Sequence, residues 1–292
     1  MLSIREVNDL KSAEVLWRAL SPKKTIFDEW DFRYCFYKYE PMEICFLAAY
    51  DDSNLVGLMP LEKHTKHGFE FFAEDPSEES RPFVKVGYEK IIPGLYDAIP
   101  GPAKCYDITG SDEFTVKLEL EDYKYILPLE NINNFEDYLK NRLSAKKQRN
   151  LRAEFRKIED LNPEIIVDDF SGIEEVFKLN SSRFPDSYLQ SEAERLAWGD
   201  LLKLPYDWHL ISIKIDNKIV AASLSVMYNN IYFYLINGAD INIPNLGKYL
   251  NKINLERAIE FKAESWDAGL GDCNWKEAWH LDKIPQYLFK KD

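Results

Sequence analysis

Three consecutive hydrophobic segments between residues 207 and 240 constrain the fold more than any other feature of this sequence. Residues 210–215 alternate as a β-strand does, and Asp216-Asn217-Lys218 is typical of a tight turn. Residues 219–227 return as a second strand, and residues 231–236 follow as a third. We therefore expect three neighbouring antiparallel strands at this point of the chain.

The segment after these strands predicts a helix and then one more strand. Asn237-Gly238-Ala239-Asp240 ends the third strand, and a helix is expected from Lys248 to about Lys262, opened by Gly247. Residues 266–269 are expected to form the last, short strand. This order places a helix N-terminus, with its free backbone N–H groups, where phosphate groups can bind.

Length, charge and cysteine content limit the class of protein. The chain has 292 residues, of which 46% are hydrophobic and 14% aromatic, so it can bury one large core or two medium ones. A net charge of -13 repels nucleic acids and anionic surfaces on average, so DNA is not an expected partner. The four cysteines form no Cys-x-x-Cys pair, which is typical of reduced thiols. The N-terminal sequence is too polar for a secretion signal and no apolar run reaches the ~20 residues of a membrane span, so we expect a cytoplasmic protein without membrane insertion.

The first half of the sequence contains a strand pair much like that of the second half. Residues 46–50 and 55–61 flank a turn, and the aromatic segment 69–72 follows them as 231–234 follows the later pair. These segments are either two unrelated hairpins or an internal duplication, and their equivalent order favours duplication. We expect two domains, residues 1–130 and residues 131–292, each a mixed α/β (α+β) structure. The polar cluster 75–80 is the expected flexible loop.

A basic helical segment lies between the two halves, over residues 135–159. Its apolar residues Leu139, Leu143, Leu151, Phe155 and Ile158 recur on one helical stripe. Its cations form the one strongly basic stretch of an acidic chain: Lys140, Arg142, Lys146, Lys147, Arg149, Arg152, Arg156 and Lys157. Such a helix is either a solvated surface or a site for a phosphate-bearing substrate or a tRNA backbone.

Three motifs in the second half resemble the FemAB-like and CelD-like branch of the GNAT superfamily, which is built from tandem GNAT domains. The segment Arg149-Asn150-Leu151-Arg152 is similar to the Arg-x-Asn-Leu-Arg signature of the family. The strand ending Ile219-Val220-Ala221-Ala222-Ser223-Leu224 is followed by a tyrosine-rich strand. Residues 267–276 look like the Asp-x-Gly…Gly-Asp-x-x-Tyr-Lys ending of the family, with Trp275 in place of Tyr.

The resemblance implies two tandem GNAT-like domains and the transfer of an acyl or aminoacyl group. The donor would be an acyl-CoA, or an aminoacyl-tRNA as in the FemAB branch, and the acceptor an amine of a small molecule or of a cell-envelope precursor. A catalytically silent protein that keeps the fold and binds a ligand is the alternative. The sequence does not fix the oligomeric state.

The expected donor site lies at Asn245, Gly247 and Lys248. A glycine at a helix start lets phosphate groups approach the backbone N–H groups, and Lys248 adds a positive charge. Typical GNAT enzymes have an Arg/Gln-x-x-Gly-x-Gly/Ala loop here, of which this sequence keeps one glycine. The alternative is an ordinary turn and helix start.

The expected catalytic residues are Asp272, Lys276 and Asp267. A carboxylate can orient or deprotonate an acceptor amine, and a lysine can stabilise an oxyanion or bind an anionic group. A structural ion pair between Asp272 and Lys276 is the alternative. Arg149 and Arg152, which fall in the family-like signature, and Tyr234 of the tyrosine-rich strand are the expected substrate-binding residues.

No metal site is expected. His64-x-x-His67 has no further ligand nearby in the sequence, and the residues around it are typical of a hairpin turn.

Overall fold

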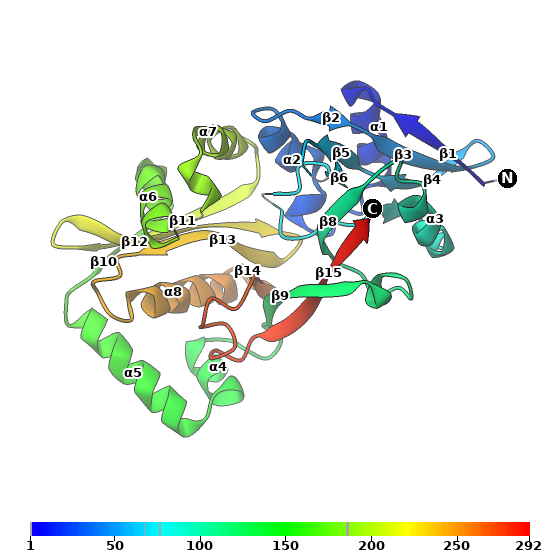
Figure 1. Ribbon diagram of the computed structural model, residues 1–292. Helices are drawn as coiled ribbons and strands as arrows, with labels where there is room; N and C mark the ends of the chain where they lie inside the picture. The colour runs from blue at the N-terminus through cyan, green and yellow to red at the C-terminus, as the bar shows by residue number, and fades with distance from the viewer. Residues whose placement is uncertain (1, 67, 76, 185–186) are drawn as a thin grey trace. The chain divides into compact units, whose positions relative to one another are not determined.

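A computed structural model describes residues 2–66, 68–75, 77–184 and 187–292, without the side chain of Tyr188. His67, one of the two histidines considered above, lies outside the described residues. The chain forms two compact units (Figure 1): unit 1 comprises residues 1–124 and 285–292, and unit 2 comprises residues 125–284. The chain passes between the units inside strands β9 (Glu119–Pro128) and β15 (Asp282–Lys291).

Unit 2 is built on the strands expected from the sequence. Its strand order is β10-β11-β12-β13-β14. The strands are β10 (Glu164–Val167), β11 (Asp207–Ile215), β12 (Lys218–Tyr228), β13 (Ile231–Ala239) and β14 (Ser265–Leu270). β10 to β13 pair in antiparallel fashion, whereas β14 pairs with β13 in parallel. A parallel neighbour requires a crossover connection, which the following helix supplies.

Helices cover both faces of this sheet. Figure 1 shows α6 and α7 on one side of the strands and α8, which connects β13 to β14, on the other. The helices of unit 2 are α4 (Phe135–Arg142), α5 (Ala145–Glu159), α6 (Ile173–Arg183), α7 (Glu192–Leu201) and α8 (Leu246–Glu260). α8 begins two residues earlier than the pattern predicted, because Asn245 adopts the left-handed conformation with φ 68° and starts the helix directly.

The basic segment expected as helical is two helices with a break at Leu143 and Ser144. Both residues have extended backbone conformations, with ψ 145° and 152°. Ser144 then caps α5, because its hydroxyl accepts a hydrogen bond from the backbone N–H of Lys147. The expected apolar stripe is largely confirmed, since Leu139, Leu143, Phe155 and Ile158 are buried.

Unit 1 has two sets of strands, in the orders β1-β3-β4-β7 and β2-β5-β6-β8, with residues 287–291 of β15 paired to β8. The strands are β1 (Leu2–Val7), β2 (Glu43–Ile44), β3 (Phe46–Asp51), β4 (Asn54–Met59), β5 (Leu61–His64), β6 (Gly68–Phe71), β7 (Phe83–Val84) and β8 (Ala103–Ile108). The helices are α1 (Leu10–Leu20), α2 (Trp30–Tyr37) and α3 (Ile92–Asp97).

The two units share an order of elements, as a duplication predicts. In unit 2, β13 is followed by a helix and by a strand that pairs with β13 in parallel. In unit 1, β6 is followed by the short strand β7, by α3 and then by β8, which pairs with β6 in parallel through Phe69 and Ala103. A mixed α/β fold with a GNAT-like order of elements is therefore confirmed.

A buried arginine organises the interior of unit 1. Arg33 is 3% exposed, and its guanidinium donates hydrogen bonds to the carbonyl oxygens of Phe27, Phe72, Ala73 and Glu79 at 2.7–3.1 Å. The recess beside Arg33 has no room for a water molecule. Ser77, Glu79 and Ser80 are buried as well. Pro76 lies outside the described residues, but Glu79 and Ser80 of the segment expected as a flexible loop are fastened to the core by their backbone groups.

Cys35, Cys45 and Cys105 are buried and Cys273 is exposed, and none of the four forms a disulfide. Within the described ranges, no helix combines the length and the apolar character that crossing a bilayer requires.

Candidate active site

The site of unit 2 begins where β13 and β14 separate. Their parallel pairing runs from Ile231 with Ser265 to Phe233 with Asp267 and then stops. One residue of β13 is also skipped in its pairing with β12, because Leu224 faces Ile236 whereas Ser225 faces Tyr234. Such a β-bulge bends the strand. The carboxyl-terminal half of β13 therefore has an edge without a β14 partner in the described pairing.

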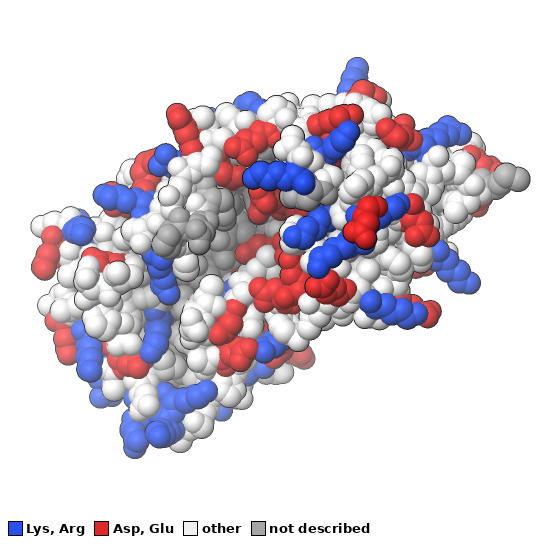
Figure 2. Space-filling model, viewed as in Figure 1, with Lys and Arg blue, Asp and Glu red and all other residues white. Residues whose placement is uncertain are grey.

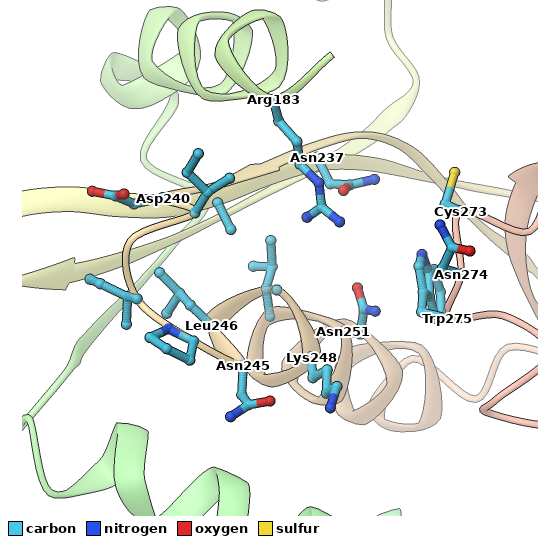
Figure 3. Close-up of a pocket in the computed structure, with 16 residues that line it drawn as sticks. Arg183, Asn237, Asp240, Asn245, Leu246, Lys248, Asn251, Cys273, Asn274 and Trp275 are labelled. Atoms are coloured by element: carbon cyan, nitrogen blue, oxygen red, sulfur yellow. The ribbon is translucent and has the colours of Figure 1, made fainter.

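A pocket of ≈ 430 Å³ lies at this end of β13 (Figure 3). Its walls come from the end of α6, the end of β13, the start of α8 and the turn after β14. Its lining residues are Arg183, Asn237, Ala239, Asp240, Ile241, Ile243, Pro244, Asn245, Leu246, Gly247, Lys248, Leu250, Asn251, Cys273, Asn274 and Trp275. All of them belong to unit 2.

The three residues expected at the donor site lie together in this pocket. Asn245 precedes α8, and Gly247 and Lys248 belong to its first turn, where backbone N–H groups have no partner within the helix. The Nζ of Lys248 forms an ion pair with Glu154 of α5 at 2.8 Å. A Cβ atom at Gly247 would lie 3.2 Å from Nη1 of Arg183, so the missing side chain leaves room for that guanidinium.

Arg183 is a site residue that the sequence did not indicate. It is the last residue of α6, and Figure 3 shows its side chain extending from that helix into the pocket. Its guanidinium lies 5.3 Å from the ring of Phe184, and no described carboxylate forms an ion pair with it. A cation that has no acidic partner in the described part of the chain, beside a helix N-terminus, is suited to an anionic ligand.

Close packing of α6 on β13 places Arg183. The side-chain amide of Asn180 donates to the carbonyl oxygen of Asn237 at 2.8 Å. A Cβ at Gly238 would lie 2.4 Å from backbone atoms of Leu179 and Asn180, so only glycine allows this approach. In the sequence, Gly238 was interpreted as a residue that ends a strand. Its role in helix packing depends on Leu179 and Asn180, some 60 residues earlier, and no local motif encodes that contact.

Tyr234 does not line the pocket but is connected to it. The residue is 3% exposed, and its hydroxyl donates a hydrogen bond to Oδ1 of Asn251 at 3.0 Å. Burial raises the pKa of Tyr234, so the phenol keeps its proton. Asn251 lies on α8 and lines the pocket.

The three expected catalytic residues lie in and after β14, and each forms a hydrogen bond with a backbone group. Nζ of Lys276 also lies 5.5 Å from the centre of the Tyr125 ring. Lys276 is 4% exposed, and its Nζ donates to the carbonyl oxygens of Gly269 at 2.9 Å and Leu270 at 2.5 Å. Oδ1 of Asp267 accepts from the N–H of Gly269 at 3.0 Å, and Oδ1 of Asp272 accepts from the N–H of Glu277 at 2.8 Å. These contacts stabilise the turn that carries Cys273, Asn274 and Trp275 into the pocket wall.

The basic surface of α5 is separate from the pocket lining. Lys146, Arg149, Arg156 and Lys157 are exposed and share one face of the helix, with Asn150 and Ala153 between them. Figure 2 shows Lys and Arg side chains gathered over this helix, at the lower left. Arg152 is engaged by Glu136 at 2.6 Å, whereas no described acid pairs with Arg149.

No group of His, Cys, Asp and Glu suited to a metal ion is found among the residues with described positions. The imidazole of His64 accepts a hydrogen bond from the N–H of Lys66 at 3.0 Å, as expected of a turn residue.

Comparisons with known proteins agree with this architecture. Residues 145–277 match the family model of the GNAT acetyltransferase domain, whereas no curated protein sequence matches the chain. The crystal structure of FemX is similar over 98% of this chain and 97% of FemX, with a TM-score of 0.60 at 11% identity. L-PGS from Bacillus licheniformis is similar over 96% of this chain and 91% of its own, with a TM-score of 0.59 at 13% identity.

A third similar structure is a tandem GNAT protein from the clavulanic acid biosynthesis pathway, which matches 99% of this chain and 98% of its own with a TM-score of 0.54 at 9% identity. The match over both units shows that unit 1 and unit 2 together form a tandem fold. Residues 145–277 therefore match a GNAT domain, and the two units together have the FemAB-like, tandem-domain fold of these structures.

Proposed function

We propose that this protein is an acyltransferase, which moves an acyl or aminoacyl group from a phosphate-bearing donor to an amine of a small molecule or cell-envelope precursor. We place the donor in the unit 2 pocket. The observation that carries the proposal is the combination, in one pocket, of an open strand edge, a helix N-terminus and an arginine that has no acidic partner among the described residues. Proteins with a similar fold include FemX and L-PGS. They also include the C-terminal domain of a putative lysylphosphatidylglycerol synthetase from Agrobacterium fabrum, whose name refers to a product that carries an amino acid.

The phosphate groups of the donor would lie between Gly247 and Arg183. The first N–H groups of α8 and the helix dipole attract an anion, and Arg183 and Lys248 add two positive charges. One acid, Asp240, also lines the pocket. Its Oδ1 already accepts hydrogen bonds from the backbone N–H and side-chain amide of Asn242, and in Figure 3 it lies at the edge of the pocket. Arg183 thus supplies part of what the missing glycine-rich loop supplies in typical GNAT enzymes.

The acyl group would reach the opening between β13 and β14. There the acceptor amine attacks the carbonyl carbon directly, and backbone N–H groups on the free edge of β13 stabilise the developing oxyanion. Asp267, Asp272 and Lys276 stay predicted catalytic residues, and their contacts favour a role in positioning the turn at the pocket wall.

The cationic face of α5 favours aminoacyl-tRNA as the donor over acyl-CoA. Four exposed cations on one helical face are more than the diphosphate of coenzyme A requires, but they suit a polynucleotide backbone. Arg149 would contact phosphate directly, and Arg152 would do so after exchanging its bond to Glu136.

The test measures melting temperature and product formation with acetyl-CoA, longer acyl-CoAs and aminoacyl-tRNA. Binding of a true donor raises the melting temperature, and a transferase consumes the donor when an amine is present. If no donor of either class binds or is consumed, the proposal is wrong. If the protein binds a ligand without turnover, and if Lys276→Ala leaves that binding unchanged, the protein is instead a catalytically silent binding protein.

Salt dependence separates the two donors. Binding of tRNA should weaken steeply with added salt, and Arg149→Ala with Arg152→Ala should flatten that dependence. Lys178→Ala is the matched control, because Lys178 is an exposed cation of α6 outside the pocket lining. If the double variant loses only thermal stability and keeps the salt dependence, α5 does not hold the donor.

A further inference from the structure

Asn251 is a buried amide whose contacts leave one end directed to the pocket. The residue is 5% exposed and lines the pocket from the second turn of α8. Its Oδ1 accepts the hydrogen bond of the Tyr234 hydroxyl at 3.0 Å. Because a phenol with a raised pKa remains a donor, this contact fixes which end of the amide faces Tyr234.

The other end of the amide has no acceptor in the described structure. No described oxygen or nitrogen accepts a hydrogen bond from Nδ2 of Asn251, and Figure 3 shows the amide between α8 and the turn that carries Trp275. Asn251 lines the pocket, so water or a bound ligand can accept this hydrogen bond. A ligand that replaces the water therefore has to provide an acceptor at this position.

The position of Asn251 identifies that acceptor. Tyr234 is the first residue of β13 after the last pair with β14, at Phe233, so Asn251 lies level with the point where the strands separate. Gly247, at the phosphate end, is four residues earlier on α8, about 6 Å along the axis. Asn251 is thus beside the opening through which the reacting carbonyl would pass.

We propose that Nδ2 of Asn251 donates a hydrogen bond to the acyl carbonyl oxygen of the donor, and that Tyr234 is a positioning residue that fixes this amide. The inference rests on the proposed function. As the amine nitrogen bonds to the carbonyl carbon, the π-electron pair of the carbonyl moves to oxygen, where Nδ2–H stabilises it. The return of that pair breaks the bond to the thiolate of coenzyme A or to the ribose oxygen of tRNA, which takes up the proton that the amine loses.

The test compares Asn251→Ala, Asn251→Asp and Tyr234→Phe with the wild-type protein. Loss of one oxyanion donor lowers kcat by roughly 10²–10³-fold, and both Asn251 variants should show this loss, because neither Ala nor Asp provides the N–H. Tyr234→Phe should lower kcat less, because the amide remains but turns more freely. Affinity for the deacylated ligands, CoA and uncharged tRNA, should be unchanged.

Asn254→Ala is the matched control, one turn further along α8. Asn254 is fully buried, accepts the hydroxyl of Tyr232 at 3.1 Å and does not line the pocket. This variant should lose stability but keep the kcat of the folded fraction. If Asn251→Ala folds and keeps wild-type kcat, or if Asn251→Asp is as active as wild type, the inference is wrong while the proposed function stands. If the wild-type protein uses no acyl donor, both fail.

Discussion

Unit 1 and unit 2 each contain an arginine on a helix, and the surroundings of the two arginines are opposite. In unit 1, Arg33 is 3% exposed and donates hydrogen bonds to the carbonyl oxygens of the loop that follows β6. In unit 2, Arg183 extends into a pocket of ≈ 430 Å³ and forms no ion pair with a described acid. The same order of strands and helix therefore gives a closed interior in one unit and an open site in the other.

The two units also differ in the helix that connects their parallel strands, α8 in unit 2 and α3 in unit 1. α8 has 15 residues and presents its first turn to the pocket, whereas α3 has 6 residues. A short helix has a small dipole and little surface for a ligand. The comparison teaches that a GNAT-like strand order provides the opening, and that the cation and the long helix convert the opening into a site.

Replacing Arg33 with Ala should have the largest effect on the protein. The change removes the donors of four carbonyl groups in a buried setting, so we expect a loss of about 3–5 kcal/mol in the free energy of unfolding. Urea denaturation followed by tryptophan fluorescence measures this loss, because Trp17 lies 5.9 Å from the guanidinium. A variant with an unchanged midpoint would show that Arg33 does not hold unit 1 closed.

The pH dependence of stability should differ in sign between the units. Burial raises the pKa of Glu62 to about 8 and that of Asp107 to about 7, both in unit 1. Between the unfolded and folded pKa values, the folded state keeps protons that the unfolded state has released. The stability that these carboxyl groups contribute is therefore present below pH 4.5 and is lost as pH rises toward 8. In unit 2 the pKa values of Asp240 and Glu277 are lowered, so their smaller contribution is lost as pH falls.

Hydrogen exchange at several pH values, read separately for peptides of each unit, measures this difference. One pKa unit corresponds to about 1.4 kcal/mol, so the effect in unit 1 should reach a few kcal/mol. Glu62→Gln should flatten the profile of unit 1 and leave that of unit 2 unchanged. A pH profile of unit 1 that Glu62→Gln does not alter would exclude Glu62 as its source.

Arg183→Ala should weaken donor binding with little effect on folding. Loss of a charge-assisted hydrogen bond of about 1.5–3 kcal/mol corresponds to roughly a 10–150-fold increase in Kd. The melting temperature of the unliganded variant should stay close to that of wild type, in contrast to Arg33→Ala. Lys178→Ala serves as the control on the same helix, and equal Kd values for the two variants would remove Arg183 from the site.

The smallest effect should come from a matched pair of glycines. A Cβ at Gly94 of α3 would meet open space, whereas a Cβ at Gly247 would lie 3.2 Å from Arg183. Both changes to Ala favour the helix by up to about 1 kcal/mol. Only Gly247→Ala should also raise the donor Kd, by a few-fold, because it displaces the guanidinium. Isothermal titration of both variants measures the difference, and a Kd raised equally in both would contradict it.

Local sequence patterns predicted the core of unit 2 and part of its site. The alternation in residues 210–236 and the glycine at the start of α8 were sufficient for the strands, the helix and the residues of the helix start that line the pocket. Arg183 and Asn251 were not predicted, because their positions depend on the packing of α6 and of Tyr234 against β13, which no short motif records. The buried contacts of Glu79 and Ser80 were missed for the same reason, since a polar cluster has the composition of a solvated loop.

The passage of the chain between the units has a consequence for synthesis on the ribosome. Residues 125–284 are inserted between β8 and its partner β15, so Ile108 pairs with Tyr287 about 180 residues later. The ends of the insertion are close, because Nζ of Lys283 lies 6.0 Å from the ring of Tyr125. While unit 2 emerges, β8 exposes an unpaired edge, and such edges template association with other chains. Residues 287–291, which are translated after unit 2, thus close a strand edge of unit 1, most of which is translated before unit 2.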